Sequence, residues 1–370
     1  MDIARLAFQW LAPWASALRG TASGPLIVGL VCAGLFWGAG PVCAQRPSTA
    51  GHVPELASYL DRLQIAEPIR YRHLAIYPLL LERGPELAGH WLGMDRAVAE
   101  GLLWVYELPG RPTVPRVVVE NRSRTEHVLI LSGEVLAGGK QSRTLRQDVI
   151  VAPGQRVELE VFCVERHRWS GGEKFLPGKV LVPPSLQWEM RQGATQQRLW
   201  EEIAHSNAAL GAANPTDSLE HALNSPPVQA QLGEVRTAIV PRLPPGTVGF
   251  IAVAGRRALG AELLGSAPLA RELMPKLLDS YAVDCVILSK GIIWPDPLPD
   301  HRPAVEFIER LCRVGSYRTS TPGSGAGIRT RAGGLAGDGV SLGGSLVHFG
   351  VQAERIVPLP GESRPLGRPE

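Results

Sequence analysis

The residues best suited to chemistry in this sequence are charged and amide side chains gathered around a pair of glycines. Glu134, Lys140, Gln141 and Arg143 all fall within one ten-residue stretch. Lysine and arginine donate charge-assisted hydrogen bonds to phosphate or carboxylate groups, and a glutamine amide can add a neutral one. The stretch therefore predicts a polar site for an anionic ligand, with Lys140, Gln141 and Arg143 as donors.

A second polar stretch follows one predicted strand later. Glu165, Arg168 and Trp169 come directly after the alternating segment 156–164. If this segment lies beside the first stretch in a sheet, Arg168 joins the donors and Trp169 can stack on a base or a sugar. Glu134 and Glu165 would then orient the donors, or one of them would act as a general base.

The same residues also have a purely structural interpretation. Arg143 and Lys140 can pair with Glu134 and Glu165 and so close a loop, because buried ion pairs often have no functional role. The sequence does not decide between ligand binding and loop closure, so both interpretations stay open.

Other kinds of active site find no support in the sequence. The nine histidines are scattered, without an HxH, HExxH or CxxC spacing that would hold a metal ion. There is no GxSxG motif, and the glycines at 323–344 match neither a P-loop nor a dinucleotide-binding motif. We therefore expect neither a metal nor a cofactor.

The N-terminus resembles a secretory signal peptide. An apolar run covers residues 25–43, Arg5 and Arg19 precede it, and small residues end it at Ala44. We expect cleavage after Ala44 and export to the periplasm or the extracellular space. The alternative is an uncleaved segment that anchors the chain in a membrane, which would be its only membrane contact.

Three cysteines remain in the mature chain: Cys163, Cys285 and Cys312. An odd number of cysteines that lie far apart argues against a disulfide framework. A single pair between Cys285 and Cys312 stays open.

The balance of charges limits the partners. The formal net charge of +3 comes from 38 basic and 35 acidic residues. A nucleic-acid-binding domain usually has a strongly basic surface, so nucleic acid is excluded as a partner. A small molecule or a protein of the cell envelope is the expected partner instead.

The first half of the mature chain is predicted to be β-rich. Short apolar or alternating segments recur every 8–12 residues, with Gly and Pro turns between them. This spacing is typical of a sandwich or a barrel, and its rhythm over 128–165 is cupin-like. The segments that carry the pattern are 102–107, 116–120, 128–131, 145–151 and 156–164.

The second half is predicted to be mixed. Helical patterns at 267–281 and 303–313 follow a β-hairpin around Gly255, and a buried strand is expected at 283–288. The glycine-rich segment 322–344 is expected to be a flexible loop or an irregular hairpin.

The predicted class is α+β and β-rich, with an N-terminal β-sandwich-like (cupin- or jelly-roll-like) half and a C-terminal mixed α/β half. The boundaries of the parts are a signal peptide at 1–44, a flexible leader at 45–60, a β-rich region at 61–170, a mixed region at 171–357 and a disordered tail at 358–370.

Two of the motifs resemble a known family. Gly139-Lys-Gln-Ser-Arg143 and the segment from Cys163 to Trp169 are similar to the signature of the ADP-ribosylglycohydrolase and rhodanese-phosphatase associated protein (ARPP) domain. The likeness extends from about residue 60 to about residue 350. It implies a link to ADP-ribose or other NAD-derived nucleotides.

Three functions are consistent with these observations. We expect an exported binding protein for a small anionic or sugar-nucleotide-like ligand. The first alternative is a hydrolase-type enzyme that acts on ADP-ribose or related nucleotides, with Glu134 or Glu165 as the catalytic carboxylate. The second is a structural cell-envelope protein in which the polar motif is an ion-pair network.

Overall fold

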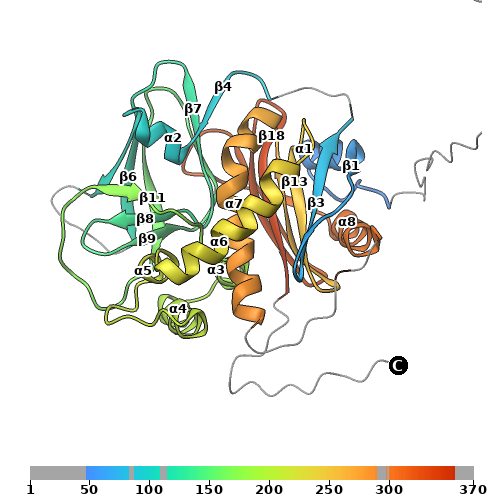
Figure 1. Ribbon diagram of the computed structural model, residues 1–370. Helices are drawn as coiled ribbons and strands as arrows, with labels where there is room; N and C mark the ends of the chain where they lie inside the picture. The colour runs from blue at the N-terminus through green and yellow to red at the C-terminus, as the bar shows by residue number, and fades with distance from the viewer. Residues whose placement is uncertain (1–46, 83–86, 109–114, 290–296, 298–299, 355–370) are drawn as a thin grey trace, which may run out of the picture. The chain divides into compact units, whose positions relative to one another are not determined.

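The fold was obtained as a computed structural model that describes residues 47–82, 87–108, 115–289, 297 and 300–354. The predicted signal peptide and tail lie outside these residues. Residues from Arg46 onward form one compact unit (Figure 1). The helix α1 (Pro54–Asp61) begins inside the predicted leader and buries Leu56, Tyr59 and Leu60.

The largest of the three sheets has nine strands, which come from both ends of the described chain. Its order is β1-β3-β13-β14-β18-β17-β16-β15, with β2 paired to β3, and each pairing is antiparallel. Its strands are β1 (Leu63–Ile65), β2 (Ile69–Tyr71), β3 (Leu74–Leu81), β13 (Gly249–Ala254), β14 (Arg257–Leu264), β15 (Tyr317–Thr319), β16 (Ala326–Ala332), β17 (Leu335–Leu342) and β18 (Ser345–Ala353).

The remaining strands form a second body, which we call the β module. Six strands pair in the order β12-β8-β9-β11-β6-β5, and three pair in the order β10-β7-β4. Both sheets share one apolar core, to which Leu92, Val119 and Leu159 belong. The module consists of β4 (His90–Gly93), α2 (Met94–Ala99), β5 (Leu103–Glu107), β6 (Arg116–Asn121), β7 (Glu126–Ile130), β8 (Val135–Gly138), β9 (Arg143–Leu145), β10 (Val149–Val151), β11 (Arg156–Cys163) and β12 (Phe175–Pro177).

These sheets confirm the prediction of a β-rich mixed fold. The division of the chain does not coincide with the division of the sheets, however. The strands β1–β3 lie within the predicted β-rich region 61–170 but pair with β13, from the second half of the chain. Antiparallel pairing of distant segments leaves no local pattern in a sequence, so this exchange was not predictable.

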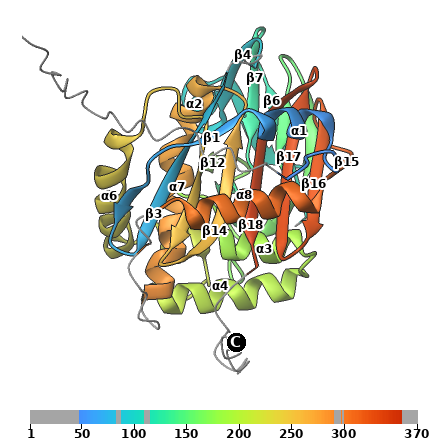
Figure 2. The ribbon, with the colours of Figure 1, turned by 90° about the vertical axis from the view of Figure 1, so that its right-hand side faces the viewer.

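Helices cover both faces of the nine-stranded sheet. On one face, α1 and α8 (Arg302–Val314) pack against Tyr77 and Ile251, and Figure 2 shows α8 lying across the strands. The other face, which carries Ile76 and Phe250, packs against the remaining helices and the β module. Those helices are α3 (Pro184–Arg191), α4 (Gln196–Leu210), α5 (Leu219–Leu223), α6 (Pro226–Ile239), η1 (Val240–Arg242) and α7 (Ala267–Ser289).

The helix α7 corrects one prediction. The expected strand at 283–288 is the last part of α7, which continues through Pro275. A short apolar run does not distinguish a buried strand from a buried helix, and α7 packs between the β module and the sheet (Figure 1). Along the described ranges, no helix is long and apolar enough to cross a membrane.

The prediction for the glycine-rich segment 322–344 is also wrong. The segment contains the regular antiparallel pair β16–β17, not a loop or an irregular hairpin. A side chain at Gly337 would lie 2.6 Å from the ring of Phe349, so this glycine makes room for a core aromatic residue. Here glycine indicates close packing of a strand and not flexibility.

Several other predictions are confirmed. The hairpin around Gly255 is β13–β14, the helix at 303–313 is α8, and strands occupy 103–107, 116–121 and 156–163. None of Cys163, Cys285 and Cys312 forms a disulfide, so the pair between Cys285 and Cys312 that the sequence left open is not made.

The burial of α7 can be tested by truncating one side chain. Leu278 is fully buried, so Leu278→Ala should lower the free energy of unfolding by about 3 kcal/mol, measured by urea denaturation. Leu176, which is 63% exposed, provides the matched control, and Leu176→Ala should change stability by less than about 0.5 kcal/mol. Equal losses in the two variants would contradict the position of α7.

Candidate functional site

Polar side chains occupy one row across the inner face of the nine-stranded sheet. The register places Glu262 of β14 and Asp338 of β17 on either side of Gly350 of β18, and Arg329 of β16 beside Asp338. Side chains of directly paired residues point to the same face of a sheet. The row therefore brings two carboxylates and one guanidinium together under the β module.

His348 of β18 lies next to this row and is held from both sides. Its Nδ1 is 2.6 Å from Oδ2 of Asp148, and its Nε2 is 2.9 Å from Oε2 of Glu262. Burial alone would lower the pKa of His348, but the two carboxylates outweigh burial and raise it to about 10. The imidazole is therefore protonated and donates from both nitrogens.

The same contacts join the two bodies of the fold. Asp148 lies in the β module, between β9 and β10, and its Oδ1 accepts a hydrogen bond of 2.7 Å from the backbone N–H of Ser132. Glu262 accepts a second hydrogen bond of 2.7 Å from the hydroxyl of Tyr281 in α7. Burial and Glu262 raise the pKa of Tyr281, so this hydroxyl keeps its proton.

Arg191, the last residue of α3, approaches the row above Gly350. A Cβ at position 350 would lie 3.2 Å from Nη2 of Arg191 and 2.7 Å from Oε2 of Glu262. Only glycine leaves room for the guanidinium there. Arg191 is 6% exposed, and its Nε and Nη1 have no hydrogen-bond partner among the described residues.

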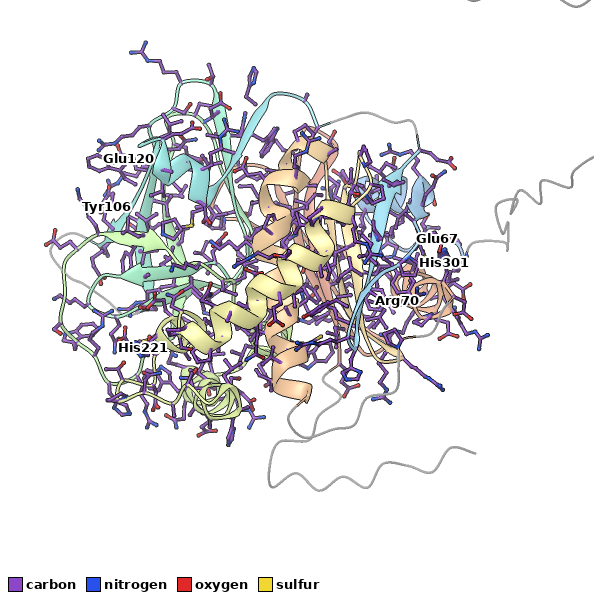
Figure 3. The ribbon with its side chains drawn as sticks, viewed as in Figure 1. Glu67, Arg70, Tyr106, Glu120, His221 and His301 are labelled. Atoms are coloured by element: carbon purple, nitrogen blue, oxygen red, sulfur yellow. The ribbon has the colours of Figure 1, made fainter. Side chains whose placement is uncertain are left out.

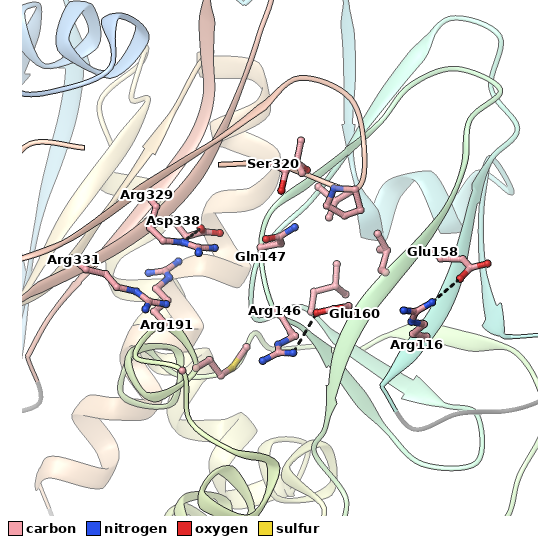
Figure 4. Close-up of a pocket in the computed structure, with 17 residues that line it drawn as sticks. Arg116, Arg146, Gln147, Glu158, Glu160, Arg191, Ser320, Arg329, Arg331 and Asp338 are labelled. Atoms are coloured by element: carbon pink, nitrogen blue, oxygen red, sulfur yellow. Dashed lines mark hydrogen bonds and ion pairs between the residues drawn. The ribbon is translucent and has the colours of Figure 1, made fainter. Parts of the chain in front are cut away.

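A pocket of about 620 Å³ opens between the β module and the nine-stranded sheet, and we call it the seam pocket. Figure 4 shows Arg191, Arg329 and Arg331 on one side of it and Arg116 with Glu158 on the other. Its lining residues are Arg116, Leu145, Arg146, Gln147, Val149, Glu158, Leu159, Glu160, Met190, Arg191, Gly193, Ser320, Thr321, Pro322, Arg329, Arg331 and Asp338.

The lining of the seam pocket is positively charged. Five arginines face three carboxylates, which leaves a formal charge of 5 − 3 = +2. Three ion pairs join Arg116 to Glu158 at 3.5 Å, Arg146 to Glu160 at 3.3 Å, and Arg329 to Asp338 at 3.3 Å. Arg191 and Arg331 form no ion pair with any residue that the structure describes. They supply the excess charge.

Asp338 has the properties of an acid–base group at the edge of this pocket. Burial and the negative charge of Asp148 raise its pKa to about 6, although Arg191 and Arg329 act in the opposite direction. A carboxyl group with a pKa near neutrality can both give and accept a proton in that pH range.

The residues that the sequence singled out lie elsewhere, in the β module, and none of the seven lines the seam pocket. Two of them are joined directly, because Oε2 of Glu165 accepts from Nη2 of Arg168 at 2.7 Å. The same oxygen accepts from the backbone N–H of Ser142 at 3.0 Å. Although burial opposes it, these two donors hold the pKa of Glu165 below its usual value.

Arg143 and Gln141 extend this network. Nη1 of Arg143 donates to the backbone oxygen of Gln141 at 2.9 Å, and Arg168 donates to the backbone oxygen of Gly139 at 2.9 Å. Arg143 is fully buried, with its pKa lowered by burial, and its Nε and Nη2 have no partner among the described residues. Backbone acceptors dominate these contacts, which therefore close the loops on either side of β9 and β11.

Trp169 and Lys140 lie at the outer edge of the same network. Trp169 is 51% exposed, and Nζ of Lys140 lies 5.6 Å from the centre of its ring. The guanidinium of Arg143 lies 6.0 Å from the same ring centre. The structure thus brings together Gln141, Arg143, Glu165 and Arg168, with Trp169 and Lys140 beside them.

Glu134 is separate from this group. Its carboxylate is 2.6 Å from Nζ of Lys276 in α7, which also lies 2.6 Å from Asp95. An ion pair of Glu134 with Lys140 or Arg143, which the structural interpretation of the sequence required, is therefore wrong. Burial raises the pKa of Glu134 to about 7, although Lys276 opposes this.

Sequence reasoning did not single out Arg191, Asp148, Glu262, Asp338 or His348. One signal was present: Glu262 and His348 are ionisable residues at buried positions of largely apolar strands. A polar residue at a buried strand position needs a buried partner. The identity of that partner requires the tertiary structure.

The buried charges contrast with those at the surface. Figure 3 shows His301 and Glu67 on the outer side of the nine-stranded sheet, where Nε2 of His301 lies 3.3 Å from the carboxylate of Glu67. Tyr106 and Glu120 lie at the far side of the β module, with a hydrogen bond of 3.4 Å. Such pairs contribute little to stability. Within the described parts, no group of His, Cys, Asp and Glu side chains is placed to hold a metal ion.

His348 should be essential for stability. His348→Gln leaves two buried carboxylates without their cation, so the free energy of unfolding at pH 7 should fall by about 3–5 kcal/mol in urea denaturation. His301→Gln is the control and should change it by less than about 0.5 kcal/mol. A small effect of His348→Gln would contradict the buried charge chain.

The pH dependence of the unfolding free energy gives a second test of the role of His348. The pKa of His348 is about 10 in the folded protein and about 6.5 in the unfolded chain, so folding favours the protonated form. Its stabilisation is complete below pH 6.5 and is lost as the pH rises toward 10. The stability of the wild type should therefore fall between pH 7 and pH 10, and His348→Gln should lack this part of the decrease.

The sequence-derived motif should divide into structural and peripheral residues. Glu165→Gln weakens two charge-assisted hydrogen bonds and should cost about 2 kcal/mol of unfolding free energy. Lys140→Ala removes an ammonium group at the edge of the network and should cost less than about 0.5 kcal/mol. Thermal and urea denaturation of both variants would measure this, and similar losses in both would refute the division.

Comparison with known proteins identifies the family to which this chain belongs. Residues 62–351 match ARPP-1, the ARG and Rhodanese-Phosphatase-superfamily-associated Protein domain, which confirms the resemblance seen in the motifs. No curated protein and no solved structure matches the sequence significantly. Since the match covers most of the chain, this protein belongs to the ARPP-1 family.

Proposed function

We propose that this protein binds a small anionic molecule in the seam pocket. The observation that carries the proposal is Arg191, a guanidinium that is 94% buried, faces the pocket and leaves two nitrogens without partners among the described residues. An unsatisfied buried donor of a charged group costs a few kcal/mol. An anion in the pocket removes this cost by accepting from Arg191.

The surroundings of Arg191 support this role. Glycine at position 350 gives the guanidinium its place, and the carboxylates of Glu262 and Asp338 flank it without forming an ion pair with it. Glu262 already accepts hydrogen bonds from His348 and Tyr281, and Asp338 already forms an ion pair with Arg329. The positive charge of Arg191 is thus left for a ligand.

Two further parts of the proposal come from the sequence. The apolar segment 25–43 supports export, with cleavage after Ala44. The sheets of six and three strands around one core support a sandwich-like architecture of cupin type for the β module. For Gln141, Arg143, Glu165 and Arg168 we propose a structural role, since most of their hydrogen bonds close loops of the module.

A hydrolase is the second candidate, and Asp338 is the observation that favours it. Its pKa of about 6 suits a general acid or base, and it faces the same pocket as Arg191. The family resemblance makes ADP-ribose and NAD-derived nucleotides the substrates to examine. Turnover of ADP-ribose by the wild type, lost in Asp338→Asn, would favour the enzyme over the binding protein.

Removal of the Arg191 guanidinium should weaken anion binding. Phosphate or citrate, compared with chloride at equal ionic strength, should raise the melting temperature of the wild type, because a ligand that binds only the folded state stabilises it. Arg191→Met should lower the affinity at least about tenfold, the equivalent of one charge-assisted hydrogen bond. Differential scanning fluorimetry and calorimetry would measure both effects.

Two further variants make this test independent of folding. Arg331→Gln changes an exposed arginine of the same pocket and should also weaken anion binding. Arg310→Met changes an arginine of a different basic pocket, lined by Arg256 and Arg257, and should leave the binding intact. Unchanged anion binding in both Arg191→Met and Arg331→Gln would refute the proposed site.

A further inference from the structure

We propose that the natural ligand of the seam pocket is a phosphomonoester of a sugar or similar polyol, and that it carries no aromatic base. This inference rests on the proposed function and names the chemical class of its ligand. Three properties of the pocket support it: its net charge, the division of its polar groups between two sides, and the composition of its lining.

The charge of the pocket matches that of one phosphomonoester. The lining has a formal charge of +2, and a phosphomonoester carries about −1.5 to −2 at pH 7. A monocarboxylate would leave positive charge uncompensated. A diphosphate with two or three negative charges would meet only two arginines that no carboxylate already occupies, Arg191 and Arg331.

The phosphate group of the ligand would bind on the side of the seam pocket that the nine-stranded sheet and the end of α3 form. Arg329 and Arg331 lie two residues apart on β16, so both side chains point to the same face, toward the end of α3 where Arg191 lies (Figure 4). Arginine is suited to phosphate because its planar fork can donate two parallel hydrogen bonds. Arg191 and Arg331 are not ion-paired with any described residue, so their donors can serve the phosphate, and Arg329 adds charge beside them.

Hydroxyl groups of the ligand would bind on the side of the seam pocket that the β module forms. Glu158 and Glu160 alternate with Leu159 on β11, and Gln147 comes from the β9–β10 loop. Carboxylates that are half occupied by an arginine still have lone pairs for sugar hydroxyls. Thr321, from the β15–β16 loop of the nine-stranded sheet, adds a hydroxyl whose oxygen is buried and has no hydrogen-bond partner in the described chain.

The lining argues against a nucleotide. None of the described residues that line the seam pocket is Phe, Tyr, Trp or His. Adenine is usually held by stacking on an aromatic ring or by an apolar slot, and here charged and polar groups alternate instead. Trp169, which the sequence suggested as the stacking residue, lies in the β module and does not line the pocket.

The experiment compares four probes that share parts of one structure: inorganic phosphate, ribose, ribose 5-phosphate and AMP. Isothermal titration of each into the wild type should give ribose 5-phosphate an affinity at least about tenfold above that of phosphate or ribose. AMP should bind no more tightly than ribose 5-phosphate, because its base finds no stacking partner. ADP-ribose serves as a fifth probe for the nucleotide alternative.

Variants assign the two ends of the ligand. Arg331→Gln should weaken ribose 5-phosphate and inorganic phosphate by the same factor. Glu160→Gln should weaken ribose 5-phosphate but not phosphate, since it acts on the sugar alone. Glu354→Gln, in the other basic pocket, is the control and should change neither affinity.

The outcomes separate this inference from the function on which it rests. AMP or ADP-ribose binding about tenfold more tightly than ribose 5-phosphate would overturn the inference and leave anion binding standing. Equal affinities for phosphate and ribose 5-phosphate would do the same, because the sugar would then contribute nothing. Absence of binding by every phosphorylated probe would overturn both.

Discussion

A buried imidazolium between two carboxylates is the interaction on which the rest of this structure depends. His348 belongs to the nine-stranded sheet, Asp148 to the β module and Glu262 to the neighbouring strand, so one side chain fixes the module against the sheet. Its positive charge offsets one of the two negative charges, and hydrogen bonds from the hydroxyl of Tyr281 and the backbone N–H of Ser132 stabilise the two carboxylates further. A buried charge is tolerated only with such partners. The seam that this arrangement creates is also where the pocket lies.

Much of the fold could be predicted from the sequence, because its signals are local. Alternation and Gly/Pro turns predicted β5, β6, β7 and β11 of the β module, and a hairpin pattern predicted β13–β14. Two predictions failed where burial removes the pattern. The end of α7 resembles a strand in sequence because it is a short and mostly apolar run, and β16–β17 resembles a loop because its glycines serve close packing. Sheet membership of β1–β3 depends on distant pairing and has no local signal.

The candidate site was harder to predict, for a physical reason. The motif from Glu134 to Trp169 led to the correct family, and its contacts are largely with backbone groups of its own loops. A motif of this kind can be specific to a family because it builds the fold. The pocket residues come from β6, from the segment β9–β11, from the end of α3 and from the segment β15–β17, and these four parts are far apart in sequence. Only the register of the strands shows that Glu262, Gly350, Asp338 and Arg329 form one row.

The central claim is that Arg191 holds the anion in the seam pocket. The most direct measurement is a crystal structure of the protein soaked with tungstate, a tetrahedral oxyanion whose anomalous scattering reveals its position. We expect the strongest peak in the seam pocket, within hydrogen-bond distance of the guanidinium of Arg191. A tungstate peak beside Lys140 and Trp169, with the seam pocket free of the anion, would contradict it.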